Sequence, residues 1–488
     1  MSRAWDDERR QLLDGISRMG DSGRAEGAHT DQLAKGFYPV AEHLRVLDTD
    51  VVLVVGPRGS GKTQITRMLT DGNLSQAIAR FAPRVRLPKY AQWVAAYPAG
   101  REIFDGSGLR DFIRRKGGSA SDVLRDVWLA YLLRRLRKHL SQKSQSRLAP
   151  LFAPPAADVS AVYEAMRGLG ADPVVALDEF DRDLEERGQH MFLTYDELDT
   201  LGHGDWRLVE AGIRGLVALW AAYTRRWQHL RAKVFLRTDL YERHAKVGGA
   251  DLYKLAASRV ELNWSDRDLY AMLLKRIANA DDRLTDYLKA AKGIEWKEDA
   301  KLGQIPVLTR WEDARPGIER MVGPYMGANQ KKGLVHRWML DHVRDGVGRA
   351  YPRPLVQMVE LAAARDRTQA ESLSKPRLLQ PVSLRLALDR VSVDHVVQAR
   401  DEFPWLDEIR ACLSKNPLVP YSDKDATILL EGIPASSVNR PPYEGKELLD
   451  YLIELGILRR RPDLRVDAPD LFLSGLGLRR KGGVRRRN

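Results

Sequence analysis

The stretch Val51-Val52-Leu53-Val54-Val55-Gly56-Pro57-Arg58-Gly59-Ser60-Gly61-Lys62-Thr63 decides the fold of this chain. Its first five residues are apolar and four of them are β-branched, which predicts a strand buried on both faces of a parallel sheet. Ile65, Met68 and Leu69 have helical spacing, so we expect a helix after the turn. A Gly-x-x-x-x-Gly-Lys-Thr turn between a strand and a helix is a P-loop, and it predicts an α/β fold whose parallel sheet is flanked by helices.

The residue types of this turn suit a bound polyphosphate. Gly56, Gly59 and Gly61 leave room for backbone N–H groups to turn inward, and the start of the helix favours negative charge. Lys62 is expected to reach the β- and γ-phosphates, and the hydroxyl of Thr63 is expected to bind Mg²⁺. The other expected nucleotide contacts in and after the turn are Pro57, Arg58, Ser60 and Gln64.

The composition limits the classes of protein to which the chain can belong. A length of 488 residues suggests about two to four domains. The single cysteine, Cys412, excludes a disulfide framework and a cysteine-based zinc site and suits a reducing compartment. No run of ~18 apolar residues is present, so we expect a cytoplasmic protein without a membrane span. The 79 basic against 66 acidic residues give a net charge of +13, which permits contact with nucleic acid.

Two acidic stretches compete for the magnesium side of the site. The first, residues 174–179, reads Val-Val-Ala-Leu-Asp-Glu, and the second lies within residues 191–199. Pro173 suits a first helical position and Gly188 suits a helix stop. Together they predict a helix over residues 173–187, which contains the first stretch.

The second stretch then becomes the strand, over residues 190–195. Its carboxyl end is followed by Asp196 and Glu197, and ligands of open α/β sheets bind at the carboxyl ends of the strands. We assign Asp196 to Mg²⁺ through water and Glu197 to polarising the attacking water. Residues 174–179 stay as the alternative.

A further strand is expected at residues 233–236, and Arg237-Thr238-Asp239 follows it. A polar cluster at this end of a strand can reach the γ-phosphate. Arg237 is the candidate, because a guanidinium neutralises charge that develops in phosphoryl transfer. The alternative is an ion pair of Arg237 with Asp239 or Asp196. Arg259, just before the last predicted strand, is a candidate for acting on ATP bound by a neighbouring subunit, which requires a ring or filament.

The order of these parts resembles the prokaryotic STAND and Orc/Cdc6-like branch of the AAA+ ATPases. The matching parts are the P-loop strand, the strand before Asp196-Glu197, the strand before Arg237-Thr238-Asp239, and Arg259-Val260-Glu261-Leu262-Asn263-Trp264 before a helix. The resemblance covers about residues 37–390, and it implies that the nucleotide is ATP. The chain departs from it after the third of these strands, where many STAND proteins have Thr-Ser-Arg.

The resemblance also implies a domain order and a biological setting. Such proteins commonly follow the ATPase core with a helical lid and a winged helix, and many act in bacterial antiviral defence. An Arg-Pro pair at the start of a lid helix implies that Arg353 points at the nucleotide; the alternative is that Arg353 caps a neighbouring carbonyl. The expected domains are a mobile N-terminal arm (1–35), a P-loop ATPase core (36–280), an insertion with the helical lid (281–390), a winged-helix-like domain (391–476) and a basic disordered tail (477–488).

The C-terminal region offers basic residues for a partner. Residues 457–466 predict the two strands of a wing, in which Arg459, Arg461 and Arg465 are candidates for phosphate contact. Residues 479–487 contain a second basic run. We expect contact with nucleic acid through these two segments; the alternatives are protein docking for the wing, and an acidic partner or mere solubility for the tail.

The sequence therefore predicts an Mg²⁺-dependent ATPase that hydrolyses ATP to ADP and phosphate and acts as a molecular switch. We expect it to form a homo-oligomer or a complex with a separate effector protein, as the resemblance to defence ATPases implies. The alternative is a DNA-binding, initiator-like ATPase. The sequence contains no nuclease, protease or deaminase motif, which favours an effector on another chain.

Overall fold

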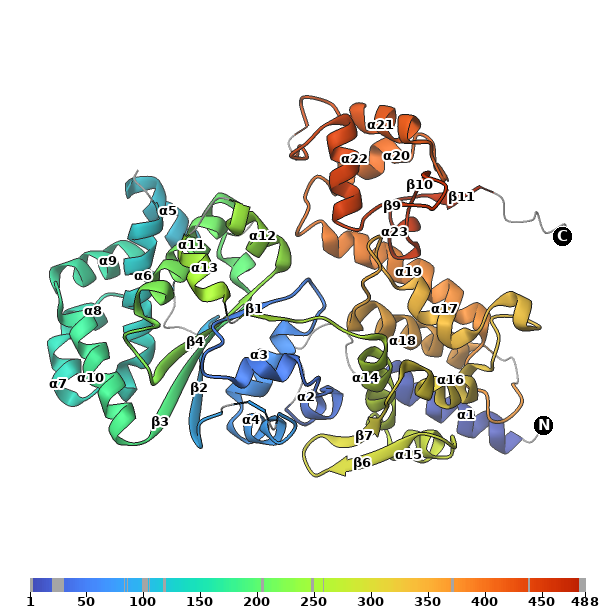
Figure 1. The fold of residues 1–488 in the computed structure, drawn as a ribbon, viewed down its shortest axis with the longest axis horizontal. Coiled ribbons are helices and arrows are strands. Elements are labelled where there is room, and N and C mark those ends of the chain that lie inside the picture. Colours follow the sequence, from blue (N-terminus) through green and yellow to red (C-terminus); the bar gives the residue numbers. More distant parts are fainter. Residues whose placement is uncertain are drawn as a thin grey trace. The chain divides into compact units, whose positions relative to one another are not determined.

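The computed structural model describes residues 3–19, 30–82, 84–85, 87–98, 104, 106–116, 120–202, 206–246, 250–257, 259–369, 373–437 and 439–481. The chain forms two compact units (Figure 1). The sheet unit is Pro39–Asn263, and the helical unit combines Met1–Tyr38 with Trp264–Asn488.

The sheet unit alternates strands with helices along the chain. Its elements are η2 (His43–Leu47), β1 (Leu53–Val55), α3 (Lys62–Thr70), α4 (Gly72–Ala79), β2 (Tyr90–Tyr97), α5 (Gly106–Lys116), α6 (Ala120–Leu136), η4 (Arg137–His139), α7 (Gln142–Arg147), α8 (Ala149–Phe152), α9 (Val159–Gly168), α10 (Asp172–Glu186), β3 (Gln189–Tyr195), η5 (Leu198–Gly202), α11 (Trp206–Tyr223), β4 (Leu230–Leu236), α12 (Thr238–Lys246), α13 (Ala250–Ala256) and β5 (Val260–Glu261).

The described strands of this unit form one parallel sheet in the order β2-β3-β4-β1-β5. β1 pairs with β4 through Leu53 opposite Val234 and with β5 through Val54 opposite Val260. β4 lies between β1 and β3, so one strand separates the P-loop strand from the strand that precedes Asp196. Because all strands run in the same direction, their carboxyl ends meet at one edge of the sheet, where a ligand site is expected.

Helices cover both faces of the sheet, α6, α10 and α11 on one side and α3 and α4 on the other (Figure 1). Met191, Leu193 and Tyr195 of β3 join a buried apolar cluster with α6, α10 and α11. Side chains alternate along a strand, so the opposite face of β3 and β4 presents Thr194 and Lys233, both fully buried. The face beneath the P-loop helix is therefore partly polar.

Lys233 is a buried lysine in β4. Its Nζ donates to the carbonyl oxygens of Asp48 and Val51, the latter at 2.6 Å, in the turn that leads into β1. Burial lowers the pKa of Lys233 to about 7. The side chain thus ties β4 to the entrance of the P-loop strand.

We expect the free energy of unfolding to rise with pH between about 7 and the ordinary lysine pKa of ~10.4. In this window native Lys233 has released its proton while the unfolded chain retains it, and stability rises wherever the unfolded state binds more protons. Lys233→Met should reduce this increase of the free energy of unfolding with pH, which urea unfolding at neutral and alkaline pH measures. Part of the increase should remain in the variant, because burial also lowers the pKa of Lys275 to about 7. The exposed Lys138→Met is the control. An unchanged pH slope in Lys233→Met contradicts the lowered pKa.

The helical unit is made mostly of helices with short strand pairs. Its elements are α1 (Arg3–Ser17), α2 (Thr30–Gly36), α14 (Asp266–Ala278), α15 (Asp282–Lys289), β6 (Glu295–Asp299), β7 (Gly303–Val307), η6 (Trp311–Ala314), α16 (Arg315–Val322), η7 (Gln330–Lys332), α17 (Val335–His342), α18 (Pro352–Thr368), α19 (Pro381–Ala399), α20 (Leu406–Leu413), β8 (Leu418–Val419), α21 (Asp423–Glu431), α22 (Gly445–Glu454), β9 (Arg459–Arg460), β10 (Val466–Asp467), α23 (Asp470–Leu473) and β11 (Arg479–Arg480).

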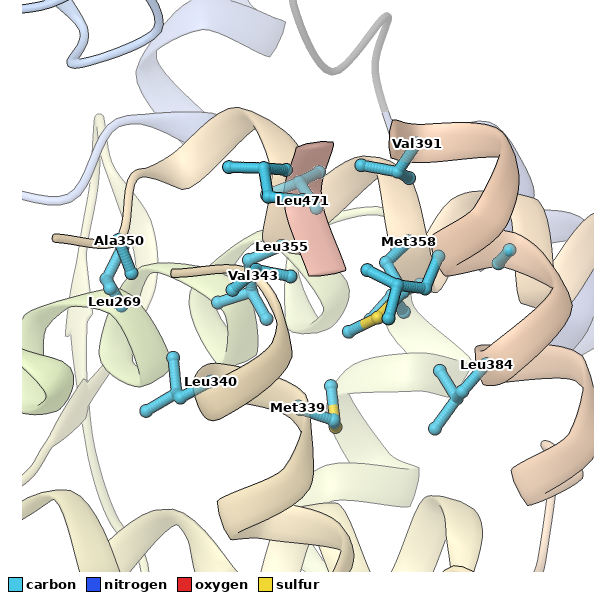
Figure 2. Close-up of a cluster of buried hydrophobic side chains, with 14 of the residues drawn as sticks. Leu269, Met339, Leu340, Val343, Ala350, Leu355, Met358, Leu384, Val391 and Leu471 are labelled. Carbon is cyan, nitrogen blue, oxygen red and sulfur yellow. The ribbon is translucent and has the colours of Figure 1, made fainter. Parts of the chain in front are cut away.

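One apolar core runs through this unit. Figure 2 shows part of it, where Leu355 and Met358 of α18 lie among side chains from α14, α17, α19 and α23. Leu269 comes from α14, Leu384 from α19 and Leu471 from α23, all essentially buried. The helical lid and the C-terminal domain therefore share one core.

The sequence predicts a short helix before a mobile arm within residues 1–35; the helix is present as α1, but it is packed in this core and is not part of a mobile arm. Leu13 and Ile16 of α1 are fully buried in the core of the helical unit. The indole nitrogen of Trp5 donates to the carbonyl of Leu373 at 2.7 Å. Burial of one face of α1 stabilises a segment whose polar composition alone suggests an arm; the rest of the predicted arm falls partly outside the described residues.

We expect Leu13→Ala to destabilise the protein by about 2–5 kcal/mol, because it removes buried methyl groups and leaves a cavity. Arg10→Ala, on the exposed side of the same helix, should change stability by less than about 0.5 kcal/mol. Chemical denaturation of the full chain measures both. Equal effects of the two substitutions would mean that α1 does not pack as described.

Two other predicted boundaries also move. The sequence predicts an ATPase core that ends at residue 280, but the sheet unit ends at Asn263, and α14 packs against α18 in the helical unit. It also predicts a basic tail from residue 477, but Arg479 and Arg480 form β11, which pairs with β8. The last seven residues lie outside the described part.

The predicted fold class is confirmed: a P-loop parallel sheet flanked by helices is followed by a helical lid and a winged-helix-like domain. In that domain α20, α21 and α22 precede the antiparallel wing strands β9 and β10, where Val466 lies opposite Arg460. Among the described residues, no helix combines the length and the apolar character needed to cross a membrane.

Candidate nucleotide site

The P-loop connects the carboxyl end of β1 to the first residue of α3. The backbone N–H of Gly56 donates to Leu236 of β4 at 3.1 Å, which fixes the start of the loop to the sheet. Gly59 and Gly61 have φ angles of 79° and 101°. These left-handed conformations suit glycine and strain other residues, so the sequence pattern and the backbone of the loop agree.

Gly56 is needed for a different reason, which is space. A Cβ atom at this position would lie 2.5 Å from Oγ of Ser60 and 3.0 Å from Cβ of Leu262. We expect Gly56→Ala to distort the loop and weaken nucleotide binding at least about fivefold, since such overpacking typically costs about 1–3 kcal/mol and 1.4 kcal/mol is about tenfold in affinity. The control is Gly72→Ala at the start of α4, where the described structure leaves open space around the added methyl group. Calorimetric titration with ATP compares them, and equal affinities contradict the prediction.

Lys62 lies over the loop. Its ammonium donates to the carbonyl oxygens of Gly56 and Pro57 at 2.7 and 2.9 Å. Both acceptors belong to the loop itself, so the positive charge is held at the place where the turn closes. The helix N-terminus that starts at Lys62 adds a partial positive charge of roughly half a unit.

The structure brings Asp196 to the P-loop from a strand more than a hundred residues away. Its backbone N–H donates to the carbonyl of Tyr97 at 2.9 Å, which joins the ends of β3 and β2. The side chains of Thr63 and Lys62 lie close enough to this carboxylate to act on its pKa. Burial raises the pKa of Asp196, whereas Lys62 and Thr63 act to lower it. The two predicted magnesium-side residues, Thr63 and Asp196, are therefore close neighbours.

Glu197 follows in a strained turn. Its φ angle of 52° is unusual for a residue with a side chain. The carbonyl of Glu197 accepts from the backbone and the hydroxyl of Thr200, at 3.0 and 2.8 Å, and that hydroxyl lies 2.8 Å from the hydroxyl of Tyr97. These contacts hold the turn in its left-handed form, and strain of this kind is often found at functional sites.

The competing acidic stretch is excluded by its conformation. Residues 174–179 lie in α10, as the helix signals predict. Asp178 is paired with Arg226 and accepts from the indole of Trp227 at 2.9 Å. Glu179 accepts from Ser144 and Arg147 of α7 at 2.9 and 2.7 Å, so this stretch has structural partners of its own.

Arg237 has two carboxylate partners in the structure. Asp239 accepts from its Nε and Nη2 at 3.0 and 2.9 Å, and Asp199 accepts from its Nη1 at 3.0 Å. The side chain of Arg237 is only 6% exposed. The ion pair with Asp239 is the alternative that the sequence leaves open, and Asp199 is a partner that the sequence does not indicate.

The other two candidate arginines also have partners. Arg259 pairs with Glu261 at 2.8 Å and lies over the ring of Tyr241. Arg353 lies in the first turn of α18, in the helical unit, where its Nη1 donates to Gln398 at 2.9 Å. Their predicted actions on nucleotide stay predictions.

The wing arginines pair with carboxylates of their own domain. Arg459 and Arg461 both reach the buried Asp467, at 3.3 and 2.9 Å. Arg465 pairs with Asp463 at 2.6 Å. These ion pairs reduce the positive charge that the sequence suggests for residues 457–466.

The sequence analysis does not identify three residues that the structure places near the candidate site: Tyr97, Asp199 and Thr200. Asp199 and Thr200 closely follow Glu197, so their sequence position is a usable signal. Tyr97 is the last residue of β2, and only the pairing of β2 with β3 places it beside Asp196.

Among known proteins, only solved structures were found to be similar to this chain. No protein-family model and no curated protein matches the chain. The Aeropyrum pernix ORC2 protein in its ADPNP–ADP complexes is similar over 89% of each chain, with 13% identity and a TM-score of 0.37. A Walker-type ATPase of Pyrococcus abyssi matches over 95% of this chain and 99% of its own, with 12% identity and a TM-score of 0.37. Cdc6p of Pyrobaculum aerophilum covers 96% and 92%, with 11% identity and a TM-score of 0.30. At such scores no residue role is transferred from these proteins.

Proposed function

We propose that the chain binds ATP with Mg²⁺ in the P-loop and hydrolyses it to ADP and phosphate. The observation that carries the proposal is that Asp196 lies near both Thr63 and Lys62, with its Oδ2 buried and without a hydrogen-bond partner among the described residues. These residues come from α3 and from the end of β3, and they meet at the carboxyl edge of the sheet. A glycine loop, an ammonium and a carboxylate together suit a triphosphate with its cation.

The residues present fit a magnesium ion. Mg²⁺ prefers hard oxygen ligands, and Thr63 and Asp196 offer a hydroxyl and a carboxylate. Oδ2 of Asp196 is buried without a hydrogen-bond partner among the described residues. Thr63 and Asp196, the latter through water, would hold the ion, which would supply charge stabilisation to the phosphates.

In this proposal Glu197 orients and polarises the water that attacks the terminal phosphate. Its position directly after Asp196, in a turn fixed by Thr200, supports that role. Lys62 holds the phosphates, and the backbone N–H groups of the loop surround them. Hydrolysis is expected to be slow, as suits a switch that persists in its ATP state.

The direct test is phosphate release from ATP by the purified full chain, with and without Mg²⁺. The proposal predicts release that needs Mg²⁺ and is absent in Lys62→Ala. If the chain binds ATP but releases no phosphate, it is a nucleotide-binding protein and the proposed hydrolysis is wrong. No binding at all contradicts the proposal as a whole.

We further propose that nucleotide state controls assembly, in a homo-oligomer or with a separate effector protein, in an antiviral defence complex. The support is the resemblance of the sequence and the division into a sheet unit and a helical unit. Mass measurement with ATP, with ADP and without nucleotide tests assembly, and Arg259→Ala tests an action across subunits. A constant monomer removes the role of Arg259 on a neighbouring subunit.

The winged-helix-like domain supports a second candidate, a DNA-binding initiator-like ATPase. Its wing is present as β9 and β10, although its arginines pair with Asp463 and Asp467. A salt titration of duplex binding should compare the full chain with one that ends at Lys481, which keeps β11. Each phosphate that the shorter chain no longer neutralises reduces the slope of log K against log salt by about 0.9. No binding at low salt removes this candidate.

A further inference from the structure

The guanidinium of Arg237 forms ion pairs with two carboxylates, and the two pairs differ in strength. Asp239 holds two of its nitrogens in a bidentate pair, at 3.0 and 2.9 Å, and its side chain is 14% exposed. Asp199 holds only Nη1, at 3.0 Å, and its side chain is 31% exposed. Bidentate, buried pairs are the stronger ones, so Asp199 is the partner that another anion displaces more easily.

Asp199 also lies close to the proposed magnesium site. It lies two residues after Glu197, in the short helix η5 that packs against α11. Its negative charge acts on Asp196 and on Tyr97, raising the pKa of each, although burial is the larger cause for both. The Asp199–Arg237 pair therefore joins the end of β4 to the loop that carries Glu197.

We propose that Asp199 is a positioning residue that occupies Nη1 of Arg237 until a γ-phosphate displaces it, so that Asp199 sets the discrimination between ATP and ADP. This inference rests on the proposed ATP site.

The chemistry of the exchange is a competition between two anions for one guanidinium. Arg237 with two carboxylates carries a net charge of −1, which repels a terminal phosphate. A γ-phosphate that takes over Nη1 replaces Asp199, while the bidentate pair with Asp239 keeps the guanidinium in place. ADP has no γ-phosphate, so the pair with Asp199 persists. ATP binding therefore includes the work of breaking an ion pair, and ADP binding does not.

The test measures the dissociation constants of ADP and of ATPγS, both with Mg²⁺, for the full chain. Asp199→Asn removes the competing charge and should raise the preference for ATPγS over ADP about tenfold, the size of one charge-assisted hydrogen bond. Arg237→Gln should lower the preference for ATPγS over ADP. The double variant Asp199→Asn/Arg237→Gln should have the same preference as Arg237→Gln alone, because the guanidinium for which Asp199 and the γ-phosphate compete is then absent. Unchanged ADP affinity in Asp199→Asn shows that the site is folded, and Asp199→Glu, which keeps the charge, should resemble wild type.

The control is Glu210→Gln, which removes a carboxylate from a half-exposed ion pair with Arg214 on α11. It should leave both dissociation constants unchanged. An Asp199→Asn effect that persists in the Arg237→Gln background, or that shifts ADP and ATPγS equally, overturns the inference. If wild type binds neither nucleotide, the proposed function fails instead, so the two failures are distinguishable.

Discussion

Lys62→Ala is expected to weaken the binding of ATP with Mg²⁺ by at least about 30-fold. Removing one partner of a desolvated charge pair costs about 2–5 kcal/mol, and each 1.4 kcal/mol is about tenfold in affinity. The ammonium lies within 2.7 and 2.9 Å of the loop carbonyls, so it is already in place for phosphate oxygens. Titration with a fluorescent ATP analogue measures the change.

The matched control is Lys138→Ala, which removes an exposed ammonium after α6. Lys138→Ala should leave the dissociation constant of ATP unchanged. The comparison thus separates the loss of a specific contact with the nucleotide from the general loss of one positive charge. If Lys62→Ala still binds within about threefold of wild type, Lys62 does not contact the nucleotide.

Glu197→Gln should separate binding from hydrolysis. A glutamine keeps the size and the hydrogen-bonding shape of the side chain but cannot accept a proton, and the loss of a general base costs about 10²–10⁴ in rate. We therefore expect ATP to bind as to wild type and phosphate release to fall by at least about 100-fold. Single-turnover release of labelled phosphate, beside equilibrium binding, measures both quantities.

Glu185→Gln on the exposed side of α10 is the control, and it should hydrolyse as wild type does. Wild-type hydrolysis by Glu197→Gln contradicts its assignment. Loss of binding in this variant would indicate that Glu197 supports the loop and does not act on water.

The parts of the site that depend on local sequence are predictable. The P-loop is a continuous stretch in which glycines adopt the positive φ angles at Gly59 and Gly61. The helix signals at Pro173 and Gly188 correctly place residues 174–179 in α10, which leaves the strand before Asp196 as the partner. In both cases the backbone conformation is set by the residues themselves.

The parts that depend on distant contacts are not predictable in the same way. Leu13 and Ile16 have helical spacing, but only packing in the helical unit shows that α1 is part of a core. The partners of Arg237 illustrate the same limit: Asp239 is two residues away in the sequence, whereas Asp199 is brought in by the pairing of β3 with β4.

The proposed magnesium site at Thr63 and Asp196 is tested most directly by the effect of Mg²⁺ on ATP affinity in wild type and in Asp196→Asn. If these residues hold the ion, Mg²⁺ should strengthen binding to wild type about tenfold or more, the size of one charge-assisted contact, and should have little effect in Asp196→Asn. An equal response to Mg²⁺ in the two proteins would contradict a magnesium site at Thr63 and Asp196.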